Sequence, residues 1–336
     1  MDGARAEEIL ELAEAVDAHL GGPDQLAWER KLSAVVPELA GAVDTFLAAG
    51  NWDGALRVAA AVGGLWATFG RVDEGRDLTT RALASGGGDA RFRARVLEIA
   101  GRLAFRQGDQ RAAAVLTDEA IDVANGVGDR RTVALAFINR ARIAFRDGNA
   151  TEMERLAQRA LDSAADDGFV EMRAVHMLAW AAEIAGDRER AIRMFHDSVE
   201  LGRRREDSQW EAMELANIGD LRVASGDLST GAEYLGRALR VVAATDDRYL
   251  LCSFLRSLGL LSARRGECET ALRLLGAAEA QYEAASLLPD PGGVDDEALV
   301  DQCRDALGSE GADTAWAAGR ALTLPKAIAE AEQAAG

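Results

Sequence analysis

The residues best suited to chemistry in this sequence of 336 residues are arginines that recur with helical spacing. Arg95, Arg102 and Arg106 are spaced to share one face of a helix, and Arg142 and Arg146 repeat the last interval in a later segment of similar sequence. The planar guanidinium can donate two parallel hydrogen bonds to one carboxylate or phosphate group. The spacing therefore indicates a surface that recognises anionic groups.

A second candidate surface combines an aromatic ring with titratable side chains. His176, Trp180 and Glu183 lie at i, i+4 and i+7, so they share one face of a helix. An aromatic ring beside polar groups is typical of a small-molecule pocket. His176 and Glu183 are also the only plausible acid and base groups for catalysis. The structural alternative is a partly exposed Trp180 that packs between helices.

Motifs of enzyme, metal and cofactor sites are absent from the sequence. There is no G-x-x-x-x-G-K-[ST] phosphate loop and no H-E-x-x-H, C-x-x-C or G-x-S-x-G, and the three cysteines and three histidines are scattered. We therefore expect no cofactor and no metal. The formal charge of −18 argues against nucleic acid as a partner.

Cellular location is inferred from the thiols and the N-terminus. An odd, scattered set of cysteines fits reduced thiols in the cytoplasm, and the acidic N-terminus does not resemble a signal peptide. The longest uncharged helical stretch, residues 58–70, is too short to span a bilayer, so we expect a buried helix there and no membrane association.

Helices that repeat along the chain must position these residues. LAFRQGDQRAAAVLTDEA from Leu103 and IAFRDGNATEMERLAQRA from Ile143 share a glycine followed by Asp or Asn. Glycine supplies the left-handed residue that ends a helix, and the Asp or Asn side chain caps the next one. Such glycines recur at nearly equal intervals along the chain, at Gly70, Gly108, Gly148, Gly186, Gly226 and Gly266. This regular period predicts an all-α solenoid of about six helix pairs.

When the six repeats are aligned on their glycines, three further columns of equivalent positions contain similar residues. They support this alignment of the repeats. Residues seven positions before each glycine are small, as close helix crossings require, and so are those twelve positions after it. Residues eleven positions before it are apolar. The first of these columns comprises Gly63, Gly101, Ala141, Ala179, Gly219 and Gly259.

Two short motifs connect these pairs to a known family. Leu258-Gly259 and the run AIRMF at 191–195 match parts of the tetratricopeptide repeat (TPR) pattern. The sequence resembles the longer form of this repeat in the C-terminal sensor region of bacterial STAND-type ATPase regulators, including LuxR-type and maltotriose-sensing activators. Segments 19–83, 273–290 and 313–331 resemble the regions that flank the repeats there. The resemblance implies a right-handed superhelix, here free-standing without the ATPase and DNA-binding domains.

The TPR resemblance also implies that the first helix of each pair lines a concave groove. Arginine occupies nine of the 30 groove positions, against roughly three for an even distribution of 36 arginines. The candidate ligand- or partner-binding residues are Arg95, Glu98, Arg102, Arg106, Ile138, Arg142, Phe145, Arg146, Arg173, His176, Trp180, Glu183, Asp220 and Arg256. The structural alternative is that these arginines complement helix dipoles or pair with acids of neighbouring repeats.

The two ends of the chain are expected to cap the repeats. Residues 1–48 fit two amphipathic helices, and residues 289–336 begin with the breaker PDPGG and fit three short helices. The repeats would then occupy residues 49–288. End helices cover the apolar faces of terminal repeats, and they could also form a homodimer interface.

The function predicted is that of a non-enzymatic protein that binds a protein or acidic peptide, with a regulatory role, through the arginine-rich groove. The alternative is a receptor or sequestering protein for a small anionic or aromatic molecule. An open, extended groove would favour the peptide, whereas a closed pocket around Trp180 with Arg102 and Arg142 would favour the receptor. An enzyme that uses His176 and Glu183 is the third hypothesis. The sequence identifies neither the partner nor the pathway.

Overall fold

The computed structural model describes residues 1–84, 86–164, 166–243, 247–290 and 296–336. These residues form seventeen α-helices and one short 3-10 helix, and no strand occurs among them. The all-α class predicted from the glycine period is therefore confirmed. No helix of this described part combines the length and hydropathy needed to cross a membrane.

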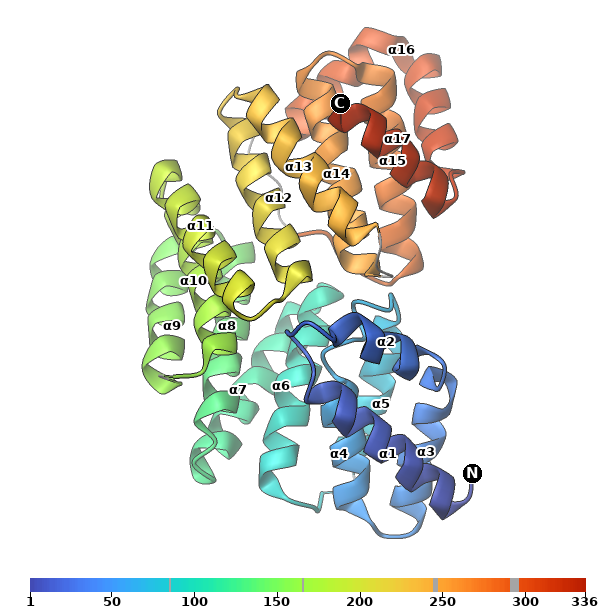
Figure 1. Cartoon of the computed structure of the whole chain (residues 1–336), viewed down its shortest axis with the longest axis vertical. Coiled ribbons are helices and arrows are strands. Elements are labelled where there is room, and N and C mark those ends of the chain that lie inside the picture. The colour runs from blue at the N-terminus through green and yellow to red at the C-terminus, as the bar shows by residue number, and fades with distance from the viewer. Residues whose placement is uncertain (85, 165, 244–246, 291–295) are drawn as a thin grey trace.

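Six antiparallel helix pairs form the body of the molecule, as the glycine period predicts (Figure 1). The pairs are α4 (Trp52–Val62) with α5 (Val72–Ala84), α6 (Ala90–Arg106) with α7 (Gln110–Gly126), α8 (Arg130–Arg146) with α9 (Ala150–Ser163), α10 (Gly168–Ile184) with α11 (Arg188–Arg204), α12 (Ser208–Ala224) with α13 (Leu228–Val242), and α14 (Arg248–Arg264) with α15 (Cys268–Ala284).

The turn inside each pair has the expected chemistry. All six key glycines have positive φ, between +64° and +86°. The side chains of Asp109, Asn149, Asp187 and Asp227 each accept a hydrogen bond from the backbone N–H three residues on, which caps the second helix. At Gly101, Gly219 and Gly259 the small-residue column lies where the two helices of a pair cross, whereas Gly63 lies against Ile99 of the next pair. A Cβ on Gly219 would stand only 2.9 Å from Leu235 Cγ.

The first pair departs from the sequence prediction. The buried helix expected over 58–70 is shorter, because α4 ends at Val62 and turns occupy residues 63–70. Gly63 and Gly64 follow the last helical residue and remove the side chains that would favour a longer helix. Leu65 and Trp66 are nevertheless buried, so this turn still belongs to the core.

Both chain ends are helical. Residues 1–48 contain three α-helices rather than the two expected, namely α1 (Gly3–Asp17), α2 (Gln25–Ser33) and α3 (Leu39–Ala48), because the 3-10 turn η1 (Val36–Glu38) separates α2 from α3. At the other end, α16 (Asp296–Arg320) is kinked at Gly308 and α17 (Leu324–Ala335) follows. These make the three helical segments expected there. The breaker at 289–293 lies partly outside the described residues.

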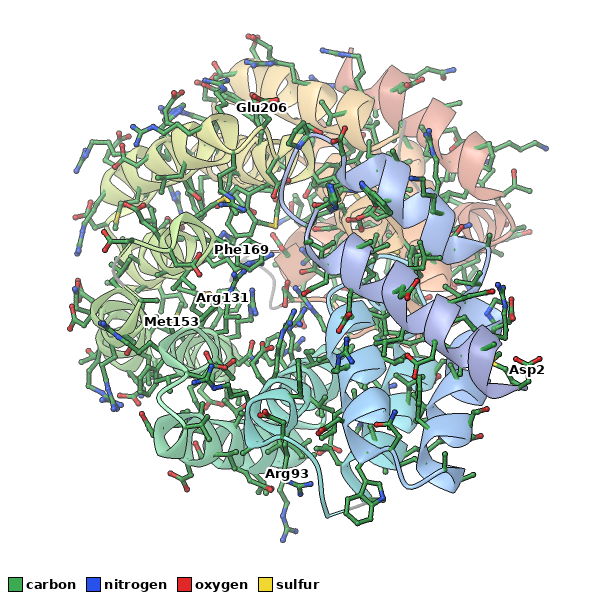
Figure 2. The ribbon with its side chains drawn as sticks, turned by 60° about the horizontal axis from the view of Figure 1, so that its bottom comes forward. Asp2, Arg93, Arg131, Met153, Phe169 and Glu206 are labelled. Carbon is green, nitrogen blue, oxygen red and sulfur yellow. The ribbon has the colours of Figure 1, made fainter. Side chains whose placement is uncertain are left out.

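The last helix pair returns to the first and closes the solenoid into a ring (Figures 1 and 2). The Leu288 N–H donates to the Arg106 carbonyl oxygen over 2.7 Å. Tyr282, Ala285 and Leu287 belong to the same buried cluster as side chains of α1, α3 and α4. The closure leaves the first helix of each pair facing the inside of the ring.

Candidate functional site

A central cavity of about 650 Å³ lies inside this ring. Its walls come from the inward faces of α6, α8, α10, α12 and α14, together with the α1–α2 loop and residues that follow α4. Arg131 and Phe169, near the N-termini of α8 and α10, point toward the centre of the ring in Figure 2. The volume lies within the range of known ligand pockets, which is roughly 300–1,000 Å³.

Twelve of the fourteen candidate residues line this cavity. They are Arg95, Glu98, Arg102, Arg106, Ile138, Arg142, Phe145, Arg173, His176, Trp180, Asp220 and Arg256.

Arg146 and Glu183 are the two candidates that do not line it. The Arg146 guanidinium instead donates to the Pro289 carbonyl oxygen over 3.2 Å, because the chain that leaves α15 covers the end of α8. Glu183 turns to the following helix, where Arg188 Nη2 lies 2.7 Å from its carboxylate. Predicting that these two side chains face the groove was therefore wrong.

Several cavity arginines are paired with acids, which fits the structural alternative for those side chains. Arg95 pairs with Asp17 of α1. Arg102 Nε lies 3.3 Å from Glu98 Oε1. Arg106 lies 3.2 Å from Asp290 and stacks 3.8 Å from the centre of the Tyr249 ring. Arg256 Nη2 lies 2.8 Å from Asp296, at the start of α16.

Arg142 and Arg173 differ, because neither forms an ion pair with a carboxylate among the described residues, although the charge of Asp207 acts on Arg173. Arg142 Nη1 donates to Asn139 Oδ1 over 3.0 Å. Arg173 stacks over the Phe169 ring at 4.1 Å, and its buried Nε has no hydrogen-bond partner in the described part of the chain. Burial and neighbouring arginines lower the pKa of Arg142 to about 9 and that of Arg173 to about 10. Both therefore stay charged at neutral pH.

His176 is held by a buried polar network. Its Nδ1 lies 3.0 Å from Glu214, whose side chain is fully buried. Glu214 also accepts from the Ser198 hydroxyl, and Ser198 accepts from Trp210 Nε1 over 3.0 Å. The acceptors within reach of the Ser198 hydroxyl are Glu214 and, over 3.3 Å, the Met172 carbonyl oxygen. The structure pairs His176 with Glu214 rather than with Glu183.

Trp180 contributes both to the cavity wall and to packing. Its ring lies 5.2 Å from that of Phe145 in α8 and 5.4 Å from that of Phe195 in α11, measured between centroids. The side chain also lines the cavity. Both interpretations of this residue, as a packing residue and as a pocket residue, are consistent with this position.

The α1–α2 loop and the start of α2 cover one end of the cavity. The Gln25 amide donates to the Gln209 side chain and, over 2.7 Å, to Glu29 Oε1. Glu29 is almost fully buried, and burial together with the nearby Asp247 and Asp207 carboxylates raises its pKa to about 7.

Sequence reasoning missed the residues at the N-terminal ends of the inner helices, of which Phe169, Trp210 and Tyr249 line the cavity. The sequence does contain a signal for these helix N-termini. Asp precedes five of the six key glycines at one constant interval, at Asp89, Asp129, Asp167, Asp207 and Asp247. All five cap the first helix of a pair. This column would have extended the groove by one helical turn.

Three solved structures match this chain over nearly its whole length. A crystal structure of a Rap protein complexed with Competence and Sporulation Factor matches with a TM-score of 0.60 and 13% identity over 98% of both chains. The apo form of RapI matches with a TM-score of 0.47 and 13% identity, covering 98% of this chain and 97% of RapI. Aspartyl phosphate phosphatase F from Bacillus subtilis matches with a TM-score of 0.46 and 14% identity over 96% of both chains.

No family model matches this sequence, and no curated protein matches it. At 13% identity the match to the Rap protein shows the fold alone, which is a TPR-like helical solenoid. The resemblance to sensor regions of STAND-type regulators is not confirmed by these comparisons.

Proposed function

We propose that this chain is a non-enzymatic binding protein that holds an acidic peptide, or an acidic segment of a protein partner, in its central cavity. The observation that carries the proposal is the composition of the cavity wall. Helices of five consecutive repeats bring arginines and aromatic rings together around about 650 Å³ of space. Arginine and aromatic side chains are the usual anchors of protein–protein recognition.

The chemistry of the wall suits a peptide. Guanidinium groups bind carboxylates bidentately, whether these belong to acidic side chains or to a C-terminus. Gln209 and Asn217 also line the cavity and add amide groups that can bond to a peptide backbone. The likeness to a Rap protein that was crystallised with Competence and Sporulation Factor supports a ligand-holding role for this architecture.

A small anionic or aromatic molecule is the second candidate, and a specific observation favours it. Trp180, Arg102 and Arg142 line one cavity inside a closed ring, which is the arrangement expected of a small-molecule receptor. The shape of the cavity favours this second candidate, whereas the arginine, aromatic and amide groups of its wall favour an acidic peptide. We rank the peptide first on that chemistry.

The remaining parts of the proposal concern organisation and context. We divide the chain into an N-terminal cap at 1–48, repeats at 49–288 and a C-terminal cap at 289–336. The protein would act in the cytoplasm in a regulatory role, as a monomer or as a homodimer formed through its caps.

Native mass spectrometry of the protein, purified gently from its own host, tests the proposal. A co-purifying polypeptide mass would support the peptide-binding role. A bound non-peptide species of a few hundred daltons would instead support the small-molecule receptor. Turnover of the bound species during incubation would contradict the non-enzymatic character of both.

A further inference from the structure

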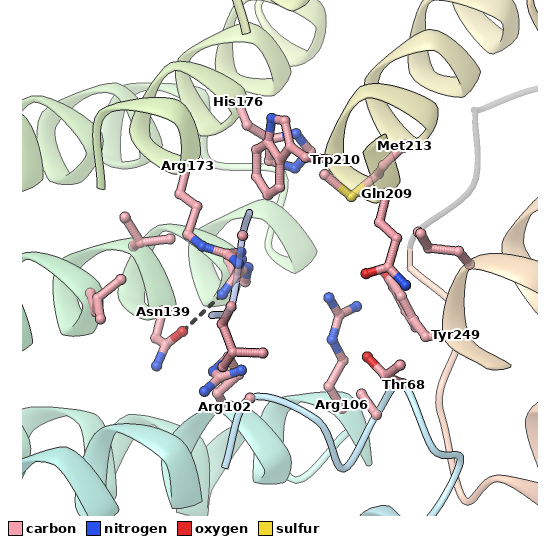
Figure 3. A pocket seen from close by; sticks show the side chains of 18 of the residues that line it. Thr68, Arg102, Arg106, Asn139, Arg173, His176, Gln209, Trp210, Met213 and Tyr249 are labelled. Carbon is pink, nitrogen blue, oxygen red and sulfur yellow. Dashed lines mark hydrogen bonds between the residues drawn. The ribbon is translucent and has the colours of Figure 1, made fainter. Parts of the chain in front are cut away.

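Four arginines from α6, α8 and α10 gather on one wall of the cavity. Figure 3 shows Arg102, Arg106 and Arg173 around the same open space. After burial, the largest influences on Arg142 are the positive charges of Arg106, Arg173 and Arg102, so these side chains lie close to one another. Like charges repel most strongly where water is scarce. A nearby negative charge would offset the repulsion among these four arginines.

Two acids that contact members of this group, Glu98 and Asp290, are already shared among other partners. Glu98 Oε1 accepts from Arg102 Nε over 3.3 Å and from the Asn139 amide over 2.9 Å. Asp290 lies 3.2 Å from Arg106 and 3.7 Å from Arg146. Arg142 and Arg173 therefore remain without an acidic partner in the described part of the chain.

The surroundings of these two arginines hold them in place without neutralising them. Asn139 is itself fixed by Glu98, and its side-chain oxygen accepts from Arg142 over 3.0 Å. Phe169 and Trp210 lie 4.1 Å and 4.9 Å from the Arg173 guanidinium carbon, which leaves the edge of that group available for hydrogen bonds. A neutral amide and two rings orient these cations, and the charge of Asp207 reaches Arg173 without forming an ion pair with it.

We propose that Arg142 and Arg173, assisted by Arg102, form a subsite for one oxyanion group of the ligand, either a carboxylate or a phosphoryl group. This inference rests on the proposed function and deepens it by naming the group that is recognised. Two guanidinium groups that face one space can each bind an oxyanion bidentately. Burying cations without a partner is costly, and an oxyanion would remove that cost.

Isothermal titration calorimetry of the full chain with simple anions tests the subsite independently of any peptide. The probes are inorganic phosphate, succinate and acetate, titrated in a chloride buffer. We expect one site for phosphate or succinate, with affinity reduced about tenfold or more in Arg142→Gln and in Arg173→Gln. Preference for phosphate would indicate a phosphorylated ligand, and preference for succinate would indicate a peptide carboxylate.

Arg140→Gln is the matched control. Arg140 lies on α8 close to Arg142 in sequence, but it pairs with Asp118 of α7 over 3.4 Å and does not line the cavity. This variant should bind the anions like the wild type. An equal loss of affinity in all three variants would show general charge attraction and would overturn the subsite.

Thermal denaturation separates the subsite from a structural role. Without added anion, Arg142→Gln and Arg173→Gln should melt at or above the temperature of the wild type, because each removes an uncompensated cation. Phosphate or succinate should raise the melting temperature of the wild type but not of these variants. Destabilised variants together with no saturable anion binding by the wild type would overturn the proposal. Peptide capture that survives both substitutions would overturn the subsite while leaving the proposed function standing.

Discussion

The backbone N–H of Arg248 donates a hydrogen bond over 2.8 Å to the carbonyl oxygen of Thr68, which lies far earlier in the chain. This bond joins the start of the sixth helix pair to the turn inside the first. It is one of several contacts that close the solenoid, and closure is what gathers the concave face around one central cavity. The cavity therefore depends on long-range contacts between the two ends of the repeat array.

Asp290 contributes to this closure, and its substitution should weaken the ring. Its carboxylate contacts Arg106, Arg146 and the Tyr249 hydroxyl. Asp290→Asn would leave two largely buried cations without a carboxylate, and we expect a loss of about 1–2 kcal/mol because solvent partly screens the site. Urea unfolding measures this loss. Asp301→Asn, which removes an exposed pair with Arg304, is the control and should change nothing measurable.

The charge on Asp290 also predicts how the difference in unfolding free energy between the wild type and Asp290→Asn depends on pH. Burial alone would raise the pKa of Asp290, but Arg106, Tyr249 and Arg146 outweigh it and hold the pKa below its ordinary value. The stabilisation is therefore present above the ordinary carboxyl pKa and is lost as the pH falls through the lower folded value. The gap between wild type and Asp290→Asn should narrow in acid. A gap that is absent at pH 7 would contradict the role of Asp290 in closure.

Glu29 should affect stability in the opposite direction. Burial, with Asp247 and Asp207 nearby, raises its pKa to about 7, although hydrogen bonds from Gln25 and Gln209 oppose the shift. Between its ordinary pKa, about 4.3, and 7, the folded state binds a proton that the unfolded state lacks, so stability falls as the pH rises. Glu29→Gln should remove this contribution.

Melting temperatures at pH 5 and pH 8 measure this effect. The wild type should lose more stability than Glu29→Gln between the two values, and the variant should be the more stable protein at pH 8. Parallel changes in both proteins would show that Glu29 of α2 ionises normally and would contradict this prediction.

Gly219 tests the register of the repeats. A Cβ added at Gly219 would lie 2.9 Å from Leu235 Cγ and 3.1 Å from the Gly231 carbonyl oxygen. Gly219→Leu should therefore overpack the crossing of α12 and α13 and cost about 1–3 kcal/mol. Gly126→Ala is the control, because no atom lies within 4 Å of its added Cβ. Equal denaturation midpoints for Gly219→Leu and the wild type would contradict the packing described for this column.

The repeat fold could be predicted because its signals are local. A glycine with positive φ and a capping carboxylate act within a few residues, so Gly108 and Asp109 mark a turn wherever the rest of the chain goes. The inward side of each first helix follows from the TPR resemblance once the repeat register is known, which explains why most candidate residues line the cavity.

The ring closure could not be predicted, because it depends on small rotations between successive repeats that no short motif encodes. Arg146 was misjudged for this reason, since Leu288 and Pro289 cover it from the far end of the chain. The pairing of His176 with Glu214 was missed because Glu214 belongs to the next repeat. Tyr249 and Asp290 were missed for the same reason, because ring closure brings these distant residues into the site, where the Tyr249 hydroxyl donates to Asp290.

The central claim is that the arginine-rich cavity captures an acidic ligand, and the double variant Arg102→Ala/Arg142→Ala tests it most directly. Both side chains line the cavity, so the variant should fold like the wild type but should lose capture. The measurement is enrichment from a random peptide library on immobilised wild type and variant, with folding checked by circular dichroism. The account predicts acidic peptides on the wild type and none on the folded variant. The same peptides on both proteins, or no acidic preference on the wild type, would contradict it.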